Sequence, residues 1–397
     1  MCECKYSPLK ENVEEMFIGP FGSALKNECF VNENEAYCMV YEQKHAIQKT
    51  MDVETRYINE QKYNELKRFN IRGGDIIVSC RGTIGETFIV PDDAPLGIMH
   101  SSIMKIRLKQ GIYDKYYFNL LLKSRLKKHA IEANGSGIKM AISATELGKE
   151  LFPVPSMDKQ LTITNVISKI SKIVELRKKE MFALDELIRA RFVEMFGDPE
   201  TNPNGWNECA LSEKLNVVGG YAFKSDGFSE ESGIPVLRIG NINAGFFRPV
   251  NLVYWQEDES LDRYAMHPGD LVMSLTGTVG KDDYGNVCIL GDDYDMYYLN
   301  QRNAKLEIIE GIDKFYLSQL LKFEQIKKKL TGISRGVRQA NISNKDILNL
   351  VVPVPPMKLQ SQFADFIKQV DKSKVKVQKA LDETQKLFDS LMQQYFG

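Results

Sequence analysis

The chain has 397 residues, of which 43% are hydrophobic and 26% are charged, and its formal net charge is −1. This length suits two or three domains, and the composition excludes a disordered or fibrous protein. No apolar run approaches the roughly 20 residues of a membrane helix, and no signal-peptide pattern is found at the amino terminus. Seven scattered cysteines favour reduced thiols, so we expect a cytoplasmic protein without a membrane partner.

The sequence contains two copies of one pattern, about 200 residues apart. Residues 74–85 recur as residues 269–280, and residues 153–155 recur as residues 353–355, so the offset rises from 195 to 200. In this alignment Glu86 takes the position of Lys281. A repeat of this length is too long for a solenoid unit and indicates a duplicated domain.

Each repeat begins with a part that we predict to be α+β, at residues 1–156 and 198–356. Short apolar runs alternate there with Gly, Pro, Asn and Asp, as in a β-rich core with tight turns. The expected strands include residues 76–79, 87–90, 103–106, 235–239 and 287–290. One helix is expected in each part, at residues 116–129 and 315–330.

Each repeat ends in a long predicted helix, at residues 157–197 and 357–397. Gly197 and Gly397 stand where a helix favours a terminal glycine, and 40 helical residues extend about 60 Å. Two similar apolar stripes favour packing of the helices on each other, although each helix could pack on its own domain. The stripes comprise Ile163, Val166, Ile170, Ile173, Leu184, Leu187 and Met195, then Phe363, Phe366, Val370, Val377, Leu387 and Leu391.

The sequence offers no catalytic or metal motif. Residues 276–281 resemble a phosphate-binding loop, but Leu275 replaces its first glycine and Asp282 replaces its Ser or Thr. We therefore expect a tight turn between two strands there. Cys2 and Cys4 have no second pair of Cys or His at metal-ligand spacing. We predict a chain that is not an enzyme and holds no cofactor of its own.

Basic clusters recur at equivalent places in the two repeats, in residues 122–139 and 322–338. Each runs from a predicted helix into a glycine-containing loop, where Lys, Ser and backbone N–H groups suit phosphate oxygens. Arg and Gln suit the edges of guanine and adenine. A solvated helix face is the alternative. The candidate nucleic-acid-binding residues are Lys26, Arg81, Thr83, Lys128, Lys139, Lys224, Ser225, Thr276, Thr278, Lys281, Lys328, Arg335, Arg338 and Gln339.

The order of these motifs resembles the specificity (S) subunit of type I restriction-modification systems. The matching elements are residues 219–225, residues 234–242, the duplicated Gly-Asp-x-x-x-Ser-x-x-Gly-Thr-x-Gly block, and Pro-x-Pro followed by Gln. Residues 195–199, which lead to Trp206, complete the pattern. The resemblance covers essentially the whole chain, although the first copy has no tryptophan before its opening.

The resemblance implies that residues 1–156 and 198–356 are target recognition domains, each reading half of a bipartite double-stranded DNA site. The long helices would pair as an antiparallel coiled coil that sets the spacer and docks two methyltransferase (M) subunits. Those partners would bring S-adenosylmethionine, and restriction (R) subunits would bring ATP and Mg²⁺. A specificity subunit of a related methylation or phage-defence system is the first alternative. RNA-binding or protein-binding adaptors are alternatives of another class.

Overall fold

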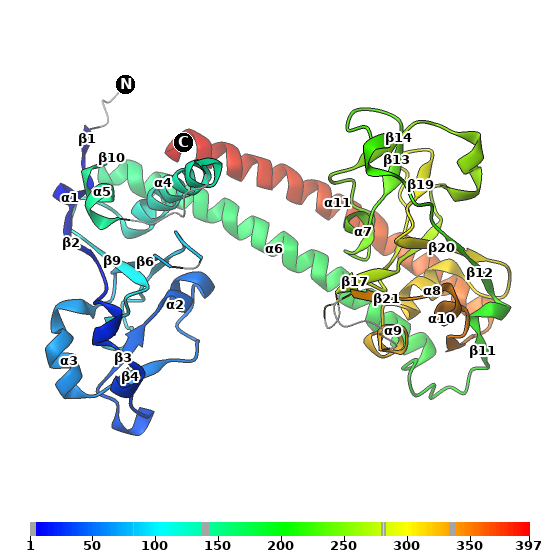
Figure 1. The fold of residues 1–397 in the computed structure, drawn as a ribbon, viewed down its shortest axis with the longest axis horizontal. Helices are drawn as coiled ribbons and strands as arrows, with labels where there is room; N and C mark the ends of the chain where they lie inside the picture. Colours follow the sequence, from blue (N-terminus) through cyan, green and yellow to red (C-terminus); the bar gives the residue numbers. More distant parts are fainter. Residues whose placement is uncertain (1–4, 82, 137–142, 279–280, 282, 333–338) are drawn as a thin grey trace. The chain divides into compact units, whose positions relative to one another are not determined.

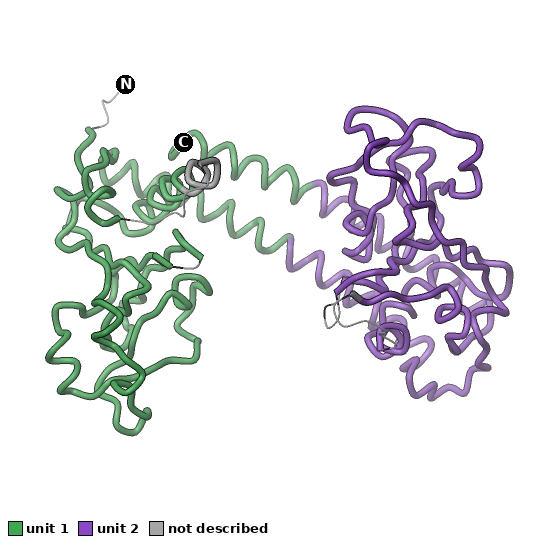
Figure 2. The backbone as a smooth tube through the Cα atoms, in the orientation of Figure 1, with its two compact units in different colours: residues 1–177, 380–397 green, residues 178–379 purple. Residues whose placement is uncertain are grey.

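The computed structural model describes residues 5–81, 83–136, 143–278, 281, 283–332 and 339–397. These residues form two compact units (Figure 2). The first unit takes residues 1–177 and 380–397, and the second takes residues 178–379. Each unit therefore contains about one half of each long helix. The predicted boundaries of the recognition domains, at residues 156 and 356, stay a prediction.

The described residues of the first unit form two four-stranded sheets and a two-stranded ribbon. Its antiparallel sheet has the order β2 (Val13–Ile18), β9 (Ile103–Leu108), β6 (Ile76–Ser79) and β7 (Thr87–Ile89). Its second sheet has the order β4 (Arg56–Ile58), β3 (Cys38–Tyr41), β8 (Gly97–Met99) and β5 (Asn70–Ile71), with β3 and β8 parallel. Strands β1 (Lys5–Pro8) and β10 (Leu151–Val154) form the ribbon beside the start of the long helix.

The second unit repeats these sheets strand for strand (Figure 1). Its antiparallel sheet has the order β12 (Leu215–Gly219), β20 (Asn303–Ile308), β16 (Leu271–Ser274) and β18 (Val287–Ile289). Its second sheet has the order β14 (Val253–Trp255), β13 (Ile234–Leu237), β19 (Tyr297–Leu299) and β15 (Ala265–Met266), with β13 and β19 parallel. The equivalent ribbon is β11 (Glu208–Ala210) with β22 (Val351–Pro353), and a further ribbon is β17 (Thr276–Thr278) with β21 (Gln339–Asn341). The predicted α+β duplication is confirmed.

The duplicated Gly-Asp motif holds the turn before the central strand. Gly74 has a φ of 83°, in the left-handed region that glycine adopts at little cost. The Asp75 carboxylate accepts a hydrogen bond from the backbone N of Arg72 at 2.8 Å and pairs with Arg107 at 2.7 Å. Asp75 is only 2% exposed, so this pairing compensates the cost of burying its charge. The motif therefore has a structural role.

Hydrogen bonds to the motif serine correct the sequence alignment of the two repeats. The Ser79 hydroxyl accepts from the backbone N of Glu86, whereas the Ser274 hydroxyl accepts from the backbone N of Asn286. Glu86 is therefore equivalent to Asn286, and its alignment with Lys281 was wrong. Seven positions separate the first pair and twelve separate the second, so this loop of the second repeat has five extra residues. Residues 276–278 form strand β17 instead of the expected tight turn.

The second predicted short helix is broken, whereas the first is continuous. Helix α4 spans Lys115–Ser136, but its counterpart is divided into α8 (Lys314–Leu320) and α9 (Glu324–Thr331). At the break, Phe323 is extended, with a ψ of 130°, and its ring centroid lies 4.9 Å from that of Phe192. Burial of this ring accompanies the interruption of the helix.

The predicted long helices are observed as α6 (Met157–Phe196) and α11 (Met357–Phe396). In the second unit, the Phe363 ring lies 5.5 Å from Phe192 and 5.4 Å from Phe196. Farther along, Lys374 Nζ contacts Asp185 Oδ1 at 2.6 Å. Since α6 residue numbers fall as those of α11 rise, these segments are antiparallel.

The first unit contains the other halves of the same helices. Arg177 of α6 donates hydrogen bonds to the Ala380 carbonyl and the Thr384 hydroxyl of α11. The last helical residue, Phe396, is 3% exposed in a core that includes Ile163. The end of α11 is therefore part of the core of the first unit, as the end of α6 is part of the second.

The helix stripes predicted from sequence are only partly buried. Ile163 and Phe363 lie in cores, but Val166, Ile173 and Leu187 are 36%, 42% and 47% exposed. The buried hydrophobic residues of α6 are Ile163, which belongs to the predicted stripe, and Ile167, Val174, Ile188, Phe192 and Phe196, which do not. Placing all the stripe residues in the seam was wrong, because the buried face lies to one side of the predicted stripe.

The glutamine after each Pro-x-Pro joins a long helix to its domain. Gln360 is fully buried, and its amide donates to the Pro355 carbonyl at 2.6 Å. Its oxygen accepts from the backbone N of Asp313 at 2.8 Å, just before α8. Gln160 makes the same two contacts, with Pro155 and Asp114. This motif is also structural.

Replacing Gln360 by Ala should lower the free energy of unfolding by about 1–3 kcal/mol, because two backbone groups lose a partner away from water. Gln362→Ala, at an exposed site two residues away, is the control and should change it by less than about 0.5 kcal/mol. Urea unfolding measures both. Equal effects of the two variants would contradict the structural role of Gln360.

Replacing the last phenylalanine of each long helix by Ala should destabilise a different unit in each case. Both tryptophans, Trp206 and Trp255, lie in the second unit, so their fluorescence reports its unfolding. Phe196→Ala should lower the stability of that unit by about 3–5 kcal/mol and shift the fluorescence transition. Phe396→Ala should shift only the part of the far-ultraviolet dichroism transition that belongs to the first unit. A fluorescence shift of equal size in both variants would contradict this assignment of the helix ends.

Candidate nucleic-acid interface

Lysines of the second unit surround an open depression of about 640 Å³, called here the basic depression. Helix α9 lies along one side, and Lys281 and residues 284–287 lie along another. Its basic lining residues are Lys281, Lys322, Lys327 and Lys328. The structure thus brings together Lys281 and Lys328, two of the predicted binding residues that are far apart in sequence.

The pattern of α9 explains why its lysines face the depression. Ile326 and Leu330, four residues apart, are buried in the core, so the intervening positions lie toward solvent. Lys327 Nζ donates to Asn286 Oδ1 at 2.6 Å. Lys328 Nζ lies 2.5 Å from Glu324 Oε1, and this hydrogen bond raises the pKa of Lys328. The lysine therefore stays charged, in an exposed pair that can exchange partners.

The second ribbon of this unit carries three more predicted residues. Thr276 pairs with Asn341 and Thr278 pairs with Gln339 in the antiparallel strands β17 and β21. The backbone N of Thr278 donates to Asp283 Oδ1 at 2.7 Å, and this bond holds the pKa of Asp283 below its usual value. A two-stranded ribbon has the dimensions to enter a DNA major groove.

Other predicted residues lie outside the basic depression. Lys224 and Ser225 are exposed at a single 3₁₀ turn, Ser225–Gly227. In the first unit, Lys26 lies 3.9 Å from Glu28 in an exposed pair, and Lys128 is half-buried on α4. The two depressions described in the first unit are lined by neither Lys26 nor Lys128.

Arg81 and Thr83 are exposed in the first unit, close to the end of β6. Burial lowers the pKa of His100, and the nearby charge of Arg81 adds a smaller effect. His100 is therefore mainly neutral at pH 7. Its Nδ1 lies 2.9 Å from the Ser102 hydroxyl.

Several predictions fall on residues outside the described ones. These are Lys139, Arg335 and Arg338 among the binding residues. Cys2 and Cys4, where no metal site was expected, also lie outside the described residues. Among the residues that are described, no group of three His, Cys, Asp or Glu side chains could hold a metal ion. No described helix is long and apolar enough to cross a bilayer.

Burial raises the pKa of the Cys38 and Cys80 thiols to about 11.

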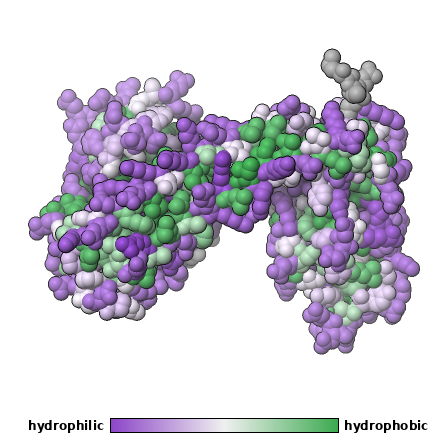
Figure 3. Space-filling view, turned by 180° about the vertical axis from the view of Figure 1, so that it is seen from behind, coloured by the Kyte–Doolittle hydropathy of each residue, from purple (hydrophilic) through white to green (hydrophobic). Residues whose placement is uncertain are grey.

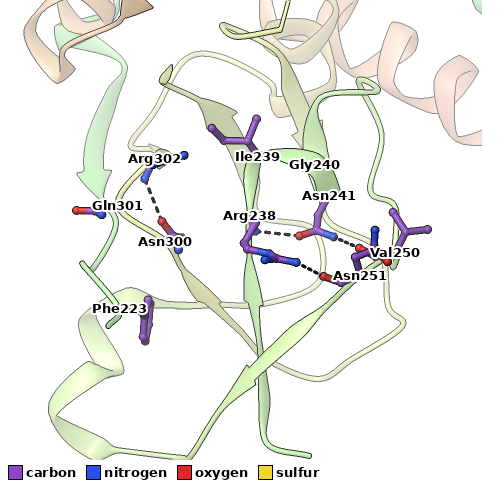
Figure 4. A pocket seen from close by; sticks show the side chains of 10 residues that line it. All are labelled: Phe223, Arg238, Ile239, Gly240, Asn241, Val250, Asn251, Asn300, Gln301 and Arg302. Atoms are coloured by element: carbon purple, nitrogen blue, oxygen red, sulfur yellow. Dashed lines mark hydrogen bonds between the residues drawn. The ribbon is translucent and has the colours of Figure 1, made fainter. Parts of the chain in front are cut away.

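A second depression of about 550 Å³ lies in the same unit and was not predicted from the sequence. It lies next to α7 (Ile239–Ile242), and its lining includes Arg238, Asn251, Asn300, Gln301 and Arg302 (Figure 4). The available signal was the run Asn-Gln-Arg after a strand, at a place where the first repeat has His-Ser-Ser. It was overlooked because these residues are not clustered with lysines.

Comparison with known proteins places this architecture in a family. The model of the type I restriction modification DNA specificity domain matches residues 11–184 and again residues 203–384. The specificity subunit of the type I restriction enzyme MjaVIII from Methanocaldococcus jannaschii is 25% identical over 331 residues, which cover 77% of this chain and 74% of that protein. The specificity subunit of the type I restriction enzyme EcoBI from Escherichia coli is 20% identical, over 81% of this chain and 73% of that protein.

Solved structures share the fold at lower sequence identity. The S subunit of a type I restriction-modification system from M. genitalium aligns with a TM-score of 0.55 and 15% identity, over 100% of this chain and 97% of that one. Since the family model accounts for both repeats, the protein belongs to the type I restriction-modification DNA specificity family.

Proposed function

We propose that this chain is the subunit that reads DNA for a type I restriction-modification complex. Each unit binds one half of a bipartite double-stranded target, and two methyltransferase subunits and restriction subunits dock on the chain. The observation that carries this proposal is the duplication itself: the same sheets occur twice, with different loops at equivalent places. Two diverged copies of one reader suit two different half-sites.

The distribution of charge supports DNA as the ligand. The net charge of −1 gives no overall attraction to a polyanion, so binding requires basic residues gathered locally. The basic depression meets this requirement with four lysines around one opening. Lysine is a compact point charge that suits phosphate oxygens, which fix the position of a protein on the duplex.

Exposed apolar residues on the long helices support docking of protein partners. In the first unit, Val166, Ile173 and Leu176 of α6 are 36%, 42% and 51% exposed. Spacings of seven and three residues place them on one face of the helix. Figure 3 shows hydrophobic side chains among hydrophilic ones along the helical segments. A methyltransferase subunit would remove these side chains from water.

In this proposal the methyltransferase and restriction subunits carry out the catalysis. S-adenosylmethionine binds the methyltransferase subunits, which methylate adenine, and ATP and Mg²⁺ bind the restriction subunits. This chain supplies orientation: it holds the duplex so that the target base meets the partner's active site. Helices α6 and α11 each contribute to both units, and their length sets the spacer between the half-sites.

Exchange of one reader tests the proposal. Replacing residues 198–356 with the equivalent segment of another family member should change one half of the recognised sequence, and replacing residues 1–156 should change the other. Sequencing methylated adenines in cells that produce each chimera with the matching methyltransferase subunit measures this. A change of both halves by one exchange, or methylation without sequence preference, would contradict the two-reader proposal.

A lysine of the basic depression should contribute to binding without contributing to specificity. Lys328→Ala should weaken binding to target and unrelated duplexes by about the same factor, and should lower the slope of log affinity against log salt by about 1. Lys345→Ala, an exposed lysine of the second unit outside the depression, is the control. Titrations at several salt concentrations measure the slope. An unchanged slope for Lys328→Ala would remove this residue from the interface.

A further inference from the structure

The strongest unassigned feature is the turn that follows strand β19. Strands β13 and β19 are parallel and adjacent, so their carboxyl ends meet at one edge of the sheet. Such edges are where open parallel sheets bind ligands. The turn from Asn300 to Asn303 begins there, and its first three residues, Asn300, Gln301 and Arg302, line the second depression (Figure 4).

The first repeat builds the same turn from other residues. In the second unit, the backbone N of Asn303 donates to the Asn300 carbonyl at 2.9 Å, and in the first, Ile103 donates to His100 at 3.2 Å. In each turn, the carbonyl of the third residue also accepts a backbone hydrogen bond from the residue that follows a strand of the antiparallel sheet. Leu275 N donates to the Arg302 carbonyl, and Cys80 N donates to the Ser102 carbonyl, both at 2.8 Å. The backbone of this turn therefore does not depend on its side chains.

The side chains on this common backbone differ in size and exposure. Ser101 and Ser102 of the first repeat are 4% and 6% exposed. Their counterparts Gln301 and Arg302 are both exposed. Since the turn forms with two small buried serines, the fold does not require a long amide and a guanidinium at these positions. These positions are therefore free to carry side chains that contact an external partner.

Arg302 is available to bind such a partner. Among the described residues, its guanidinium has no hydrogen-bond or ion-pair partner, and its backbone N donates to the Asn300 side chain at 3.3 Å. Arg238, by contrast, is fixed at the same depression by donating to the Asn251 carbonyl. A fixed arginine and an unpaired arginine thus line one opening of about 550 Å³.

The mixture of groups favours a base edge over a phosphate. Phosphate oxygens only accept hydrogen bonds, so a phosphate site needs donors alone. The depression also presents the amides of Gln301, Asn300 and Asn251, each of which carries an acceptor oxygen as well as donors. Arginine pairs in a bidentate manner with guanine, and glutamine pairs with adenine, in the DNA major groove.

We propose that the turn of residues 300–303 reads bases for the second unit, with Arg302 binding a guanine edge and Gln301 contacting a neighbouring base. This assignment rests on the proposed function and adds the residues that decide which sequence the second unit recognises. The equivalent turn of the first unit carries His-Ser-Ser, so the two units select different bases from one position of a common fold.

The test uses the full chain in complex with its methyltransferase subunits and a double-stranded DNA library of randomised sequence. Bound duplexes are sequenced for the wild type, for Arg302→Ala, and for Gln301→Ser/Arg302→Ser, whose serines the first repeat already accommodates in this turn. Arg263→Ala is the control, because Arg263 is an exposed arginine of the same unit outside the depression. Binding of unselected DNA is measured in parallel.

Both variants should lose the preference for guanine at one base pair by about 5- to 150-fold, while the other half of the target is retained. Arg263→Ala should keep the wild-type pattern. An unchanged pattern in both variants would overturn the assignment while leaving the proposed function intact. Equal weakening on all sequences with a reduced salt slope would make Arg302 a phosphate contact and also overturn it. A wild-type complex without any sequence preference would refute the proposed function itself.

Discussion

The structure depends on the burial of each long helix in the cores of two units. Phe192 and Phe196 of α6 pack with Phe363 of α11 in the second unit, and Phe396 of α11 lies in the core of the first. The first unit completes its core only with residues 380–397, which are separated in sequence from residues 1–177. Apolar burial of this kind is the main favourable contribution to folding, so the helices belong to the readers as much as to the connection between them.

The repeated motifs hold the backbone, and their neighbours are free to vary. Asp75, Ser79 and Gln160 use their polar atoms on turns and strand ends, and their counterparts in the second repeat make equivalent bonds. Buried polar groups must be satisfied, which restricts such positions to one residue type. Other positions on the same backbone carry no such restriction, as residues 101 and 301 show: Ser101 is buried, whereas Gln301 is exposed. A scaffold of this kind suits a protein whose target must diverge while its fold is kept.

Charge is used locally in this chain. Basic and acidic residues nearly cancel overall, yet lysines gather at the basic depression and arginines gather beside the turn of residues 300–303. The two places differ in chemistry, since lysine offers a point charge and arginine offers a planar fork of donors. This difference is the physical basis for assigning position to one and sequence reading to the other.

The sequence by itself determined the duplication, the α+β class and the two long helices, because repeat spacing, apolar runs and the absence of Gly and Pro are local properties. It also placed Lys281 and Lys328 among candidate residues, although not in one opening. Tertiary structure alone decided that Glu86 corresponds to Asn286, that Phe323 breaks a helix, and which helix faces are buried. These features depend on hydrogen bonds and packing between segments far apart in the chain, which no local pattern encodes. The same holds for the second depression, whose residues come from four separate segments.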